Sequence, residues 1–187
     1  MSLKLVYYGQ NDSVNCVPDV TLTGDPGTDQ ATLTAAGYLG GKIMTIGAPG
    51  DRGNDAYGEA SNTESVIYPC DSESKAPFAT LLNGPGEFSG AIGPAGSKKA
   101  PVVRALWQGN VNNEAYDTGA TWTGSLGAFL FCGGTTNTII GKYTLVARLN
   151  TNTNTLVTAI EAGKLPVGIC THIPSTSEPW LGVASLL

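Results

Sequence analysis

Residues 142–162, KYTLVARLNTNTNTLVTAIEA, form the longest stretch of this chain without glycine or proline. Between residues 143 and 149 the side chains alternate, with Tyr143, Leu145, Ala147 and Leu149 on one side of an extended backbone. A period of two residues is typical of a β-strand. The Thr/Asn run at residues 151–155 favours a turn, so we expect a β-hairpin whose second strand covers residues 156–161.

The rest of the chain is divided into shorter segments by 25 glycines and 11 prolines among 187 residues. We predict strands at residues 3–8, 65–68, 101–108, 127–132, 165–172 and 180–187, and two more between residues 32 and 46. The best helix candidate is residues 77–82, where Pro77 suits a first turn. The sequence therefore predicts an all-β fold, a small β-barrel or sandwich with long Gly/Pro-rich loops and at most one or two short helices.

The N-terminal region has a different character from the rest. Residues 10–29 mix Asn, Asp, Pro, Gly and Thr with a few apolar side chains that lack a core of their own. We therefore predict an N-terminal strand and extended arm over residues 1–30, followed by a single β-rich domain over residues 31–187 with a protruding loop at 83–99. The predicted interface residues are Val14, Val17, Val20, Leu22 and Trp180.

Residues suited to catalysis or metal binding are few and scattered. The single histidine, His172, stands before Pro174 without a nearby nucleophile motif, which favours a structural role. The loop at residues 50–59 carries oxygen donors, but it lacks EF-hand spacing and its residue types are those of turns. We predict no catalytic residue, no metal, no cofactor and no enzymatic activity.

The net charge and the hydropathy of the chain limit the classes of partner that it can bind. The formal net charge is −5 and Lys98-Lys99 is the only adjacent basic pair, which argues against nucleic-acid binding. No apolar run approaches the ~18 residues of a membrane span, and the N-terminus lacks the core of a signal peptide. The four cysteines show no metal or redox spacing. We therefore expect synthesis in a reducing cytoplasm, with buried thiols and no membrane partner.

Four segments carry a resemblance to a known family: AFLF at residues 128–131, GKY at 141–143, LPVGIC at 165–170 and PWLGVA at 179–184. In these segments the chain resembles the head-decoration, or cement, proteins of tailed bacteriophages. The resemblance spans the second half of the chain and carries no functional residue over. It implies a structural virion protein that is made in the host cytoplasm and binds the capsid exterior. It also implies a homotrimer or homodimer whose arm orders against the major capsid protein.

Two other functions stay open. One alternative is a receptor- or glycan-binding module of a phage tail fibre or head fibre. Exposed tryptophans in a concave groove would favour it, and the chain offers Trp107, Trp122 and Trp180 as stacking residues. The other is a small polysaccharide hydrolase, which needs a pair of carboxylates that no segment of the sequence points to.

Overall fold

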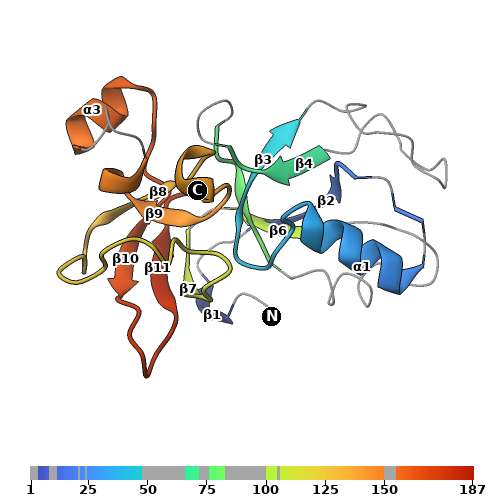
Figure 1. The fold of residues 1–187 in the computed structure, drawn as a ribbon, viewed down its shortest axis with the longest axis horizontal. Helices are drawn as coiled ribbons and strands as arrows, with labels where there is room; N and C mark the ends of the chain where they lie inside the picture. Colours follow the sequence, from blue (N-terminus) through green and yellow to red (C-terminus); the bar gives the residue numbers. More distant parts are fainter. Residues whose placement is uncertain are drawn as a thin grey trace.

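The computed structural model describes residues 4–8, 12–20, 22–23, 25–47, 66–71, 76–82, 100–104, 106–149 and 155–187. Within these ranges the secondary-structure elements are mostly β-strands, with two α-helices of 10 and 6 residues. The strands form two sheets that define two lobes, a barrel lobe on the right of Figure 1 and a sheet lobe on the left. The predicted all-β fold with one or two short helices is confirmed.

The barrel lobe contains β2 (Asp12–Pro18), β3 (Ile43–Gly47), β4 (Val66–Pro69), β5 (Ala79–Leu81) and β6 (Ala100–Arg104). The strand order is β2-β4-β3-β5-β6, and pairing of β2 with β6 closes the ring. Only β2 and β4 run parallel; the other pairs are antiparallel. Every strand of this lobe therefore has a neighbour on both sides.

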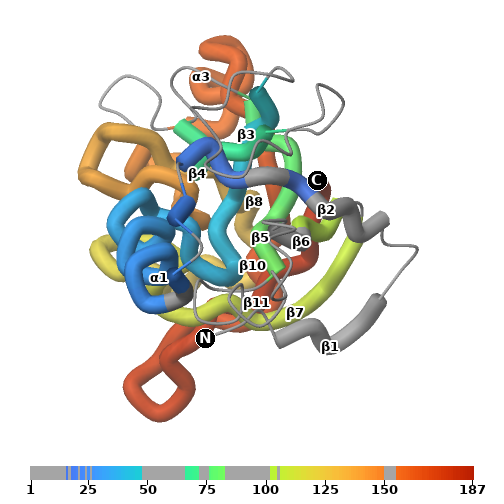
Figure 2. Tube along the Cα trace, turned by 90° about the vertical axis from the view of Figure 1, so that its right-hand side faces the viewer, coloured from blue at the N-terminus to red at the C-terminus, as the bar shows by residue number. Residues whose placement is uncertain are grey.

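The sheet lobe is a six-stranded antiparallel sheet in the order β1-β7-β11-β10-β8-β9. Its strands are β1 (Lys4–Tyr8), β7 (Trp107–Val111), β8 (Phe129–Cys132), β9 (Tyr143–Leu145), β10 (Gly168–His172) and β11 (Leu181–Ser185). In Figures 1 and 2 alike, the connection between β10 and β11 projects from the body of the protein.

Helix α1 (Pro26–Ala35) covers the barrel lobe. Asp25 caps its N-terminus by accepting a hydrogen bond from the Thr28 N–H at 2.9 Å, and proline fits the first turn because its missing N–H is not needed there. Leu33 and Tyr38 pack into the barrel core. The Tyr38 hydroxyl donates to the carbonyl of Ile67 at 2.7 Å and accepts from the Asp19 N–H at 2.8 Å. These bonds tie the segment after the helix to β4.

The structure corrects the predicted extended arm. Residues 14 and 17 lie in β2, where their backbones pair with residues 102 of β6 and 66 of β4, respectively, as part of the barrel. Leu22 is 2% exposed in the barrel core, with Val20 packed against it. The apolar side chains of Val20 and Leu22 thus find their partners within the same chain, because β2 inserts between β4 and β6.

Three predicted elements are wrong. Residues 79–81 of the expected helix at 77–82 form β5, because pairing with β3 and β6 outweighs local helix propensity. The first strand expected between residues 32 and 46 is the end of α1. The second strand of the predicted hairpin is helix α3 (Leu156–Glu161), whose capping box joins Thr155 and Thr158. The predicted strand at 101–108 is divided between β6 and β7.

The two lobes share hydrogen bonds and a core. The Ile43 N–H of β3 donates to the Gly141 carbonyl at 2.8 Å, and the hydroxyls of Thr80 and Tyr143 lie 2.8 Å apart. Ile43 and Val103 belong to the same apolar cluster as Trp107 and Leu130 of the sheet lobe.

Gly41 also lies at this contact between the lobes. It has φ +87°, and a Cβ there would lie 3.0 Å from the Ala115 Cβ. Glycine therefore allows the turn before β3 to approach the sheet lobe closely.

Candidate interaction surface

The two faces of the sheet lobe differ in what covers them. On one face, alternate residues such as Trp107, Leu130 and Val183 are buried in the shared core. Because successive side chains of a strand point to opposite faces, Gln108, Phe129 and Ala184 belong to the other face.

Part of this second face is covered by the chain that follows β9. Phe131 is buried there against Leu149 and Ala159, with Val146 packed beside them. Leu149 follows the short helix η2 (Val146–Arg148), and Ala159 is the only buried residue of α3. This cover lies over Phe131, and Phe129 is two residues further along the same strand face.

The remainder of the second face is only partly covered. Strand register aligns Phe129 of β8 with Ile169 of β10, Ala184 of β11 and Gln108 of β7. Phe129 is 43% exposed, and Leu186, which continues the face beyond β11, is 44% exposed. We call Phe129, Ile169, Ala184 and Leu186 the open sheet surface.

Helix α3 presents a second set of exposed apolar residues. Leu156, Val157 and Ile160 are all exposed, and their spacing of three and four residues places them on one side of the helix. Leu165, also exposed, lies two residues before Val167, whose carbonyl accepts the Leu186 N–H at 2.9 Å. The chain thus leads from α3 towards the edge of the open sheet surface.

Trp180 directly precedes β11, at the end of the β10–β11 connection, and is 40% exposed. Across this connection, His172 Nε2 of β10 lies 3.3 Å from Glu178 Oε2. The histidine therefore contacts a carboxylate of its own hairpin, and we assign it no further role.

The buried carboxylate of Asp117 fixes the position of η2, next to the open sheet surface. Asp117 accepts hydrogen bonds from Arg148 Nε, the Thr144 hydroxyl and the Gly119 N–H, each at 2.9 Å. Burial by itself raises the pKa of Asp117, but these bonds and the Arg148 charge together outweigh burial and lower the pKa. The ion pair holds η2 against β9 and so supports the cover over Phe131.

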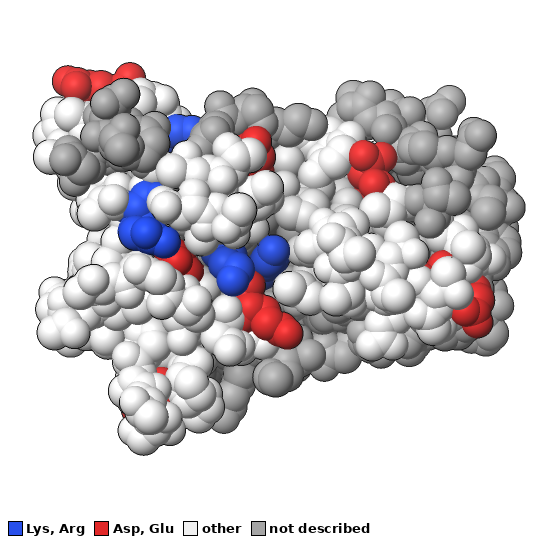
Figure 3. Space-filling model, viewed as in Figure 1, with Lys and Arg blue, Asp and Glu red and all other residues white. Residues whose placement is uncertain are grey.

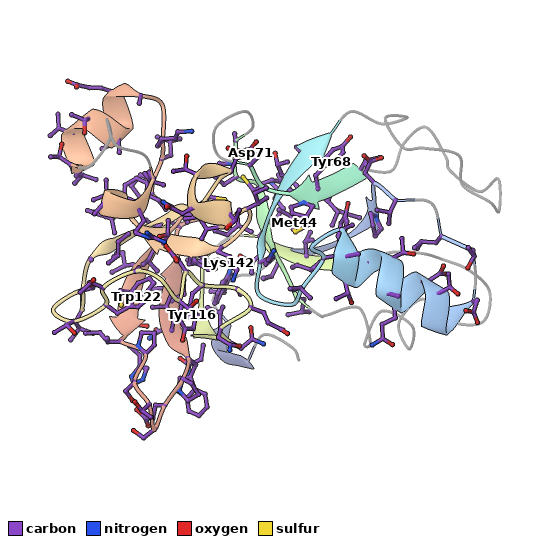
Figure 4. All side chains as sticks on the ribbon, viewed as in Figure 1. Met44, Tyr68, Asp71, Tyr116, Trp122 and Lys142 are labelled. Carbon is purple, nitrogen blue, oxygen red and sulfur yellow. The ribbon has the colours of Figure 1, made fainter. Side chains whose placement is uncertain are left out.

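A buried amine lies between the lobes. The Lys42 residue is 8% exposed, and within the described part of the chain it makes no ion pair. Burial lowers the pKa of Lys42 to about 8, and Lys142 adds to this effect against smaller opposing contributions from Cys132 and Glu114. Lys142 lies at the centre of the molecule in Figure 4, and Figure 3 shows that charged side chains are sparse on this face.

The predicted interface residues are not brought together. Val20 and Leu22 contribute to the barrel core, the side chains of Val14 and Val17 lie outside the described residues, and Trp180 lies on the sheet lobe. Of the three tryptophans proposed as a stacking platform, Trp107 and Trp122 are buried. The predicted loops at 50–59 and 83–99 also lie outside the described residues. In the part of the chain that the structure covers, no group of three or more His, Cys, Asp or Glu side chains is arranged to hold a metal ion.

Sequence reasoning missed the open sheet surface. Phe129 and Leu186 stand in apolar runs, at 127–132 and 180–187, that predict strands. The continuous run at 127–132 indicates burial on both faces, and this is wrong for Phe129, which is 43% exposed. Register across four strands, which a single sequence does not state, puts them beside Ile169 and Ala184.

Comparison of the chain with protein-family models, with curated proteins and with solved structures finds no match. No helix among the described residues is long and apolar enough to cross a membrane.

Proposed function

We propose that this chain is a structural virion protein that binds the outer surface of a bacteriophage capsid and stabilises the shell. The observation that supports the proposal best is the open sheet surface, in which Phe129 and Leu186 are exposed and Ile169 and Ala184 are half-buried on an otherwise well-packed sheet. Exposed apolar patches on a folded protein are typical of sites that another protein covers. The resemblance of residues 128–131, 165–170 and 179–184 to decoration proteins falls on this same lobe.

The proposed partner of the open sheet surface is the major capsid protein. Phe129 supplies an aromatic side chain and Leu186 an aliphatic one, while Gln108 provides a polar end to the row. An apolar centre with a polar margin is the usual make-up of a protein interface. Trp180 of the neighbouring hairpin is a further anchor, because tryptophan often contributes strongly to binding.

In this proposal the N-terminal region has no role as a docking arm. Because β2 closes the barrel, a partner cannot take residues 12–18 without opening that lobe. The exposed apolar side of α3 is then available for contact between copies of the chain, as in a homodimer or homotrimer on the shell. Such contacts would repeat with the symmetry of the capsid.

A binding assay tests the proposal. Purified protein is mixed with expanded, undecorated capsids of the phage whose genome encodes the chain, and co-sedimentation and the temperature of capsid rupture are measured. The full chain should sediment with the capsids and raise the rupture temperature. The Phe129→Asp variant should lose at least about tenfold in affinity, because a carboxylate would be buried in an apolar contact.

The matched control is Leu106→Asp, because Leu106 is exposed at 64% but lies between β6 and β7, outside the open sheet surface. This variant should bind like the unmodified chain. Equal loss in both variants, or no sedimentation of the unmodified chain, would contradict the proposal.

A glycan- or receptor-binding role has one observation in its favour, the exposed Trp180 on a projecting hairpin. A single exposed tryptophan offers one stacking face to a sugar. Binding of the chain to host cells or to a glycan array that Trp180→Ala abolishes, together with no capsid binding, would favour this function instead.

A further inference from the structure

Cys70 and Cys132 face each other across the junction of the two lobes. Cys70 follows β4 of the barrel lobe, Cys132 ends β8 of the sheet lobe, and both are buried thiols. The Cys132 thiol lies 3.5 Å from the Cys70 carbonyl oxygen and 3.4 Å from the Gly133 carbonyl oxygen. The Cys70 side chain is also a hydrogen-bonding neighbour of the Cys132 thiol.

One shared donor holds the backbone of Cys70 close to that of Gly133, the residue that follows Cys132. The Gly141 N–H donates both to the Cys70 carbonyl at 2.8 Å and to the Gly133 carbonyl at 3.1 Å. Two carbonyls that accept from the same N–H must belong to adjacent stretches of chain. A disulfide needs two Cα atoms about 4.4–6.8 Å apart, so its two cysteines must lie on neighbouring stretches of chain such as these.

We infer that Cys70 and Cys132 are a disulfide-forming pair that links the two lobes when the protein meets a peroxide. One thiolate attacks hydrogen peroxide to give a sulfenic acid and hydroxide, and the second thiol condenses with the sulfenic acid to form the S–S bond and release water. Overall, two thiols and one peroxide give one disulfide and two waters, so the sulfur atoms are oxidised and the peroxide oxygens are reduced.

The other two cysteines are placed differently. Cys16 lies in the barrel core, in a separate apolar cluster from Cys70 and Cys132. The Cys170 thiol donates to the carbonyl of His172 on its own strand, at 3.5 Å. The geometry therefore singles out one pair among the four thiols.

Burial controls the rate of the reaction. Burial and the neighbouring Cys70 raise the pKa of Cys132, so little of it is thiolate at neutral pH. The bond should therefore form slowly at neutral pH and faster in alkaline solution. A particle that leaves a reducing cytoplasm would acquire this bond gradually outside the cell.

The test is to treat the purified full chain with hydrogen peroxide at mildly alkaline pH, remove the oxidant, count thiols in denaturant and map peptides without reduction. The protein should lose one pair of its four thiols and yield a linked peptide that contains Cys70 and Cys132. The bond closes a 62-residue loop, so the melting temperature should rise by about 5–10 °C and return on reduction.

The double variant Cys16→Ser/Cys170→Ser keeps the pair and should behave like the unmodified chain. The variants Cys70→Ser and Cys132→Ser should each gain no intramolecular bond and no thermal stability from peroxide. Four intact thiols after treatment, a bond to Cys16 or Cys170, a bond between chains, or sulfinic acid at Cys132 would each overturn the inference.

Discussion

The barrel lobe and the sheet lobe use the same kinds of residue but leave different surfaces. In the barrel lobe each strand is paired on both sides and α1 packs on the ring, so Ile67, Leu81 and Val102 are fully buried. In the sheet lobe one face is buried, while the other is covered only over Phe131 and open at Phe129. In a closed sheet every strand is hydrogen-bonded to a neighbour on both sides, whereas an open sheet with an uncovered apolar face offers a binding surface to a partner. The comparison locates the proposed interface on the sheet lobe.

The largest effect should come from a cavity in the barrel core. Leu81→Ala removes a fully buried side chain and should lower the free energy of unfolding by about 2–5 kcal/mol. Leu106→Ala removes an exposed side chain and should change it by less than about 0.5 kcal/mol. Urea unfolding followed by tryptophan fluorescence measures both. Similar effects of the two variants would show that the barrel core does not carry the stability assigned to it.

A smaller loss should follow when the carboxylate beside the open face is removed. Asp117→Asn should destabilise the protein by about 1–3 kcal/mol, because the Arg148 charge loses its partner. The folded pKa of Asp117 is lowered, so its contribution is present above the unfolded pKa and is lost as the pH falls through the folded pKa. The difference between Asp117→Asn and the unmodified chain should thus shrink in acid. A difference that stays constant down to low pH would contradict this role.

Replacing the buried Lys42 at the junction of the lobes should raise the stability of the protein, in contrast to the two preceding substitutions. Lys42→Met should stabilise the protein by about 1–2 kcal/mol at neutral pH, because it replaces a buried charged side chain with an apolar side chain of similar shape. The folded pKa of Lys42 is about 8 and its ordinary value is 10.5, so the unfolded chain binds more protons between these values. The penalty is present below about 8 and disappears as the pH rises towards 10.5.

The measurement for Lys42 is the difference in unfolding free energy between variant and unmodified chain at several pH values. Taking the difference cancels the titration of the buried tyrosines and cysteines. Lys142→Met, at the more exposed neighbour, is the control and should give a smaller gain. A gain for Lys42→Met that is the same at neutral and alkaline pH would exclude burial of the charged amine as its cause.

A substitution in the open sheet surface itself should have a small effect on stability. Phe129→Ala removes a larger side chain than Leu81→Ala, yet it should change the free energy of unfolding by only about 0.5–1 kcal/mol, because Phe129 is 43% exposed. The same denaturant titration measures it. A loss comparable to that of Leu81→Ala would mean that this face is packed and is no interface.

Some of these features follow from the sequence and others do not. Short apolar runs bounded by frequent Gly and Pro predicted the strands at β1, β4, β8, β10 and β11, and with them the all-β class. The helices were missed because their signals are local and short: Asp25-Pro26 begins α1, and Thr155 with Thr158 caps α3. The strand β5 could not be found at all from residues 77–82, since its partners are distant in sequence.

The sequence by itself determined that this chain forms sheets, that its thiols are few and separated, and that its surface carries little charge. These properties depend on composition and on neighbours along the chain. Only the tertiary structure decided that residues 12–18 close a barrel, that Phe129 stays exposed while Phe131 is covered, and that Cys70 meets Cys132. Each of these depends on which distant strands pair and in which register, and a shift of one residue would turn every side chain of a strand to the other face.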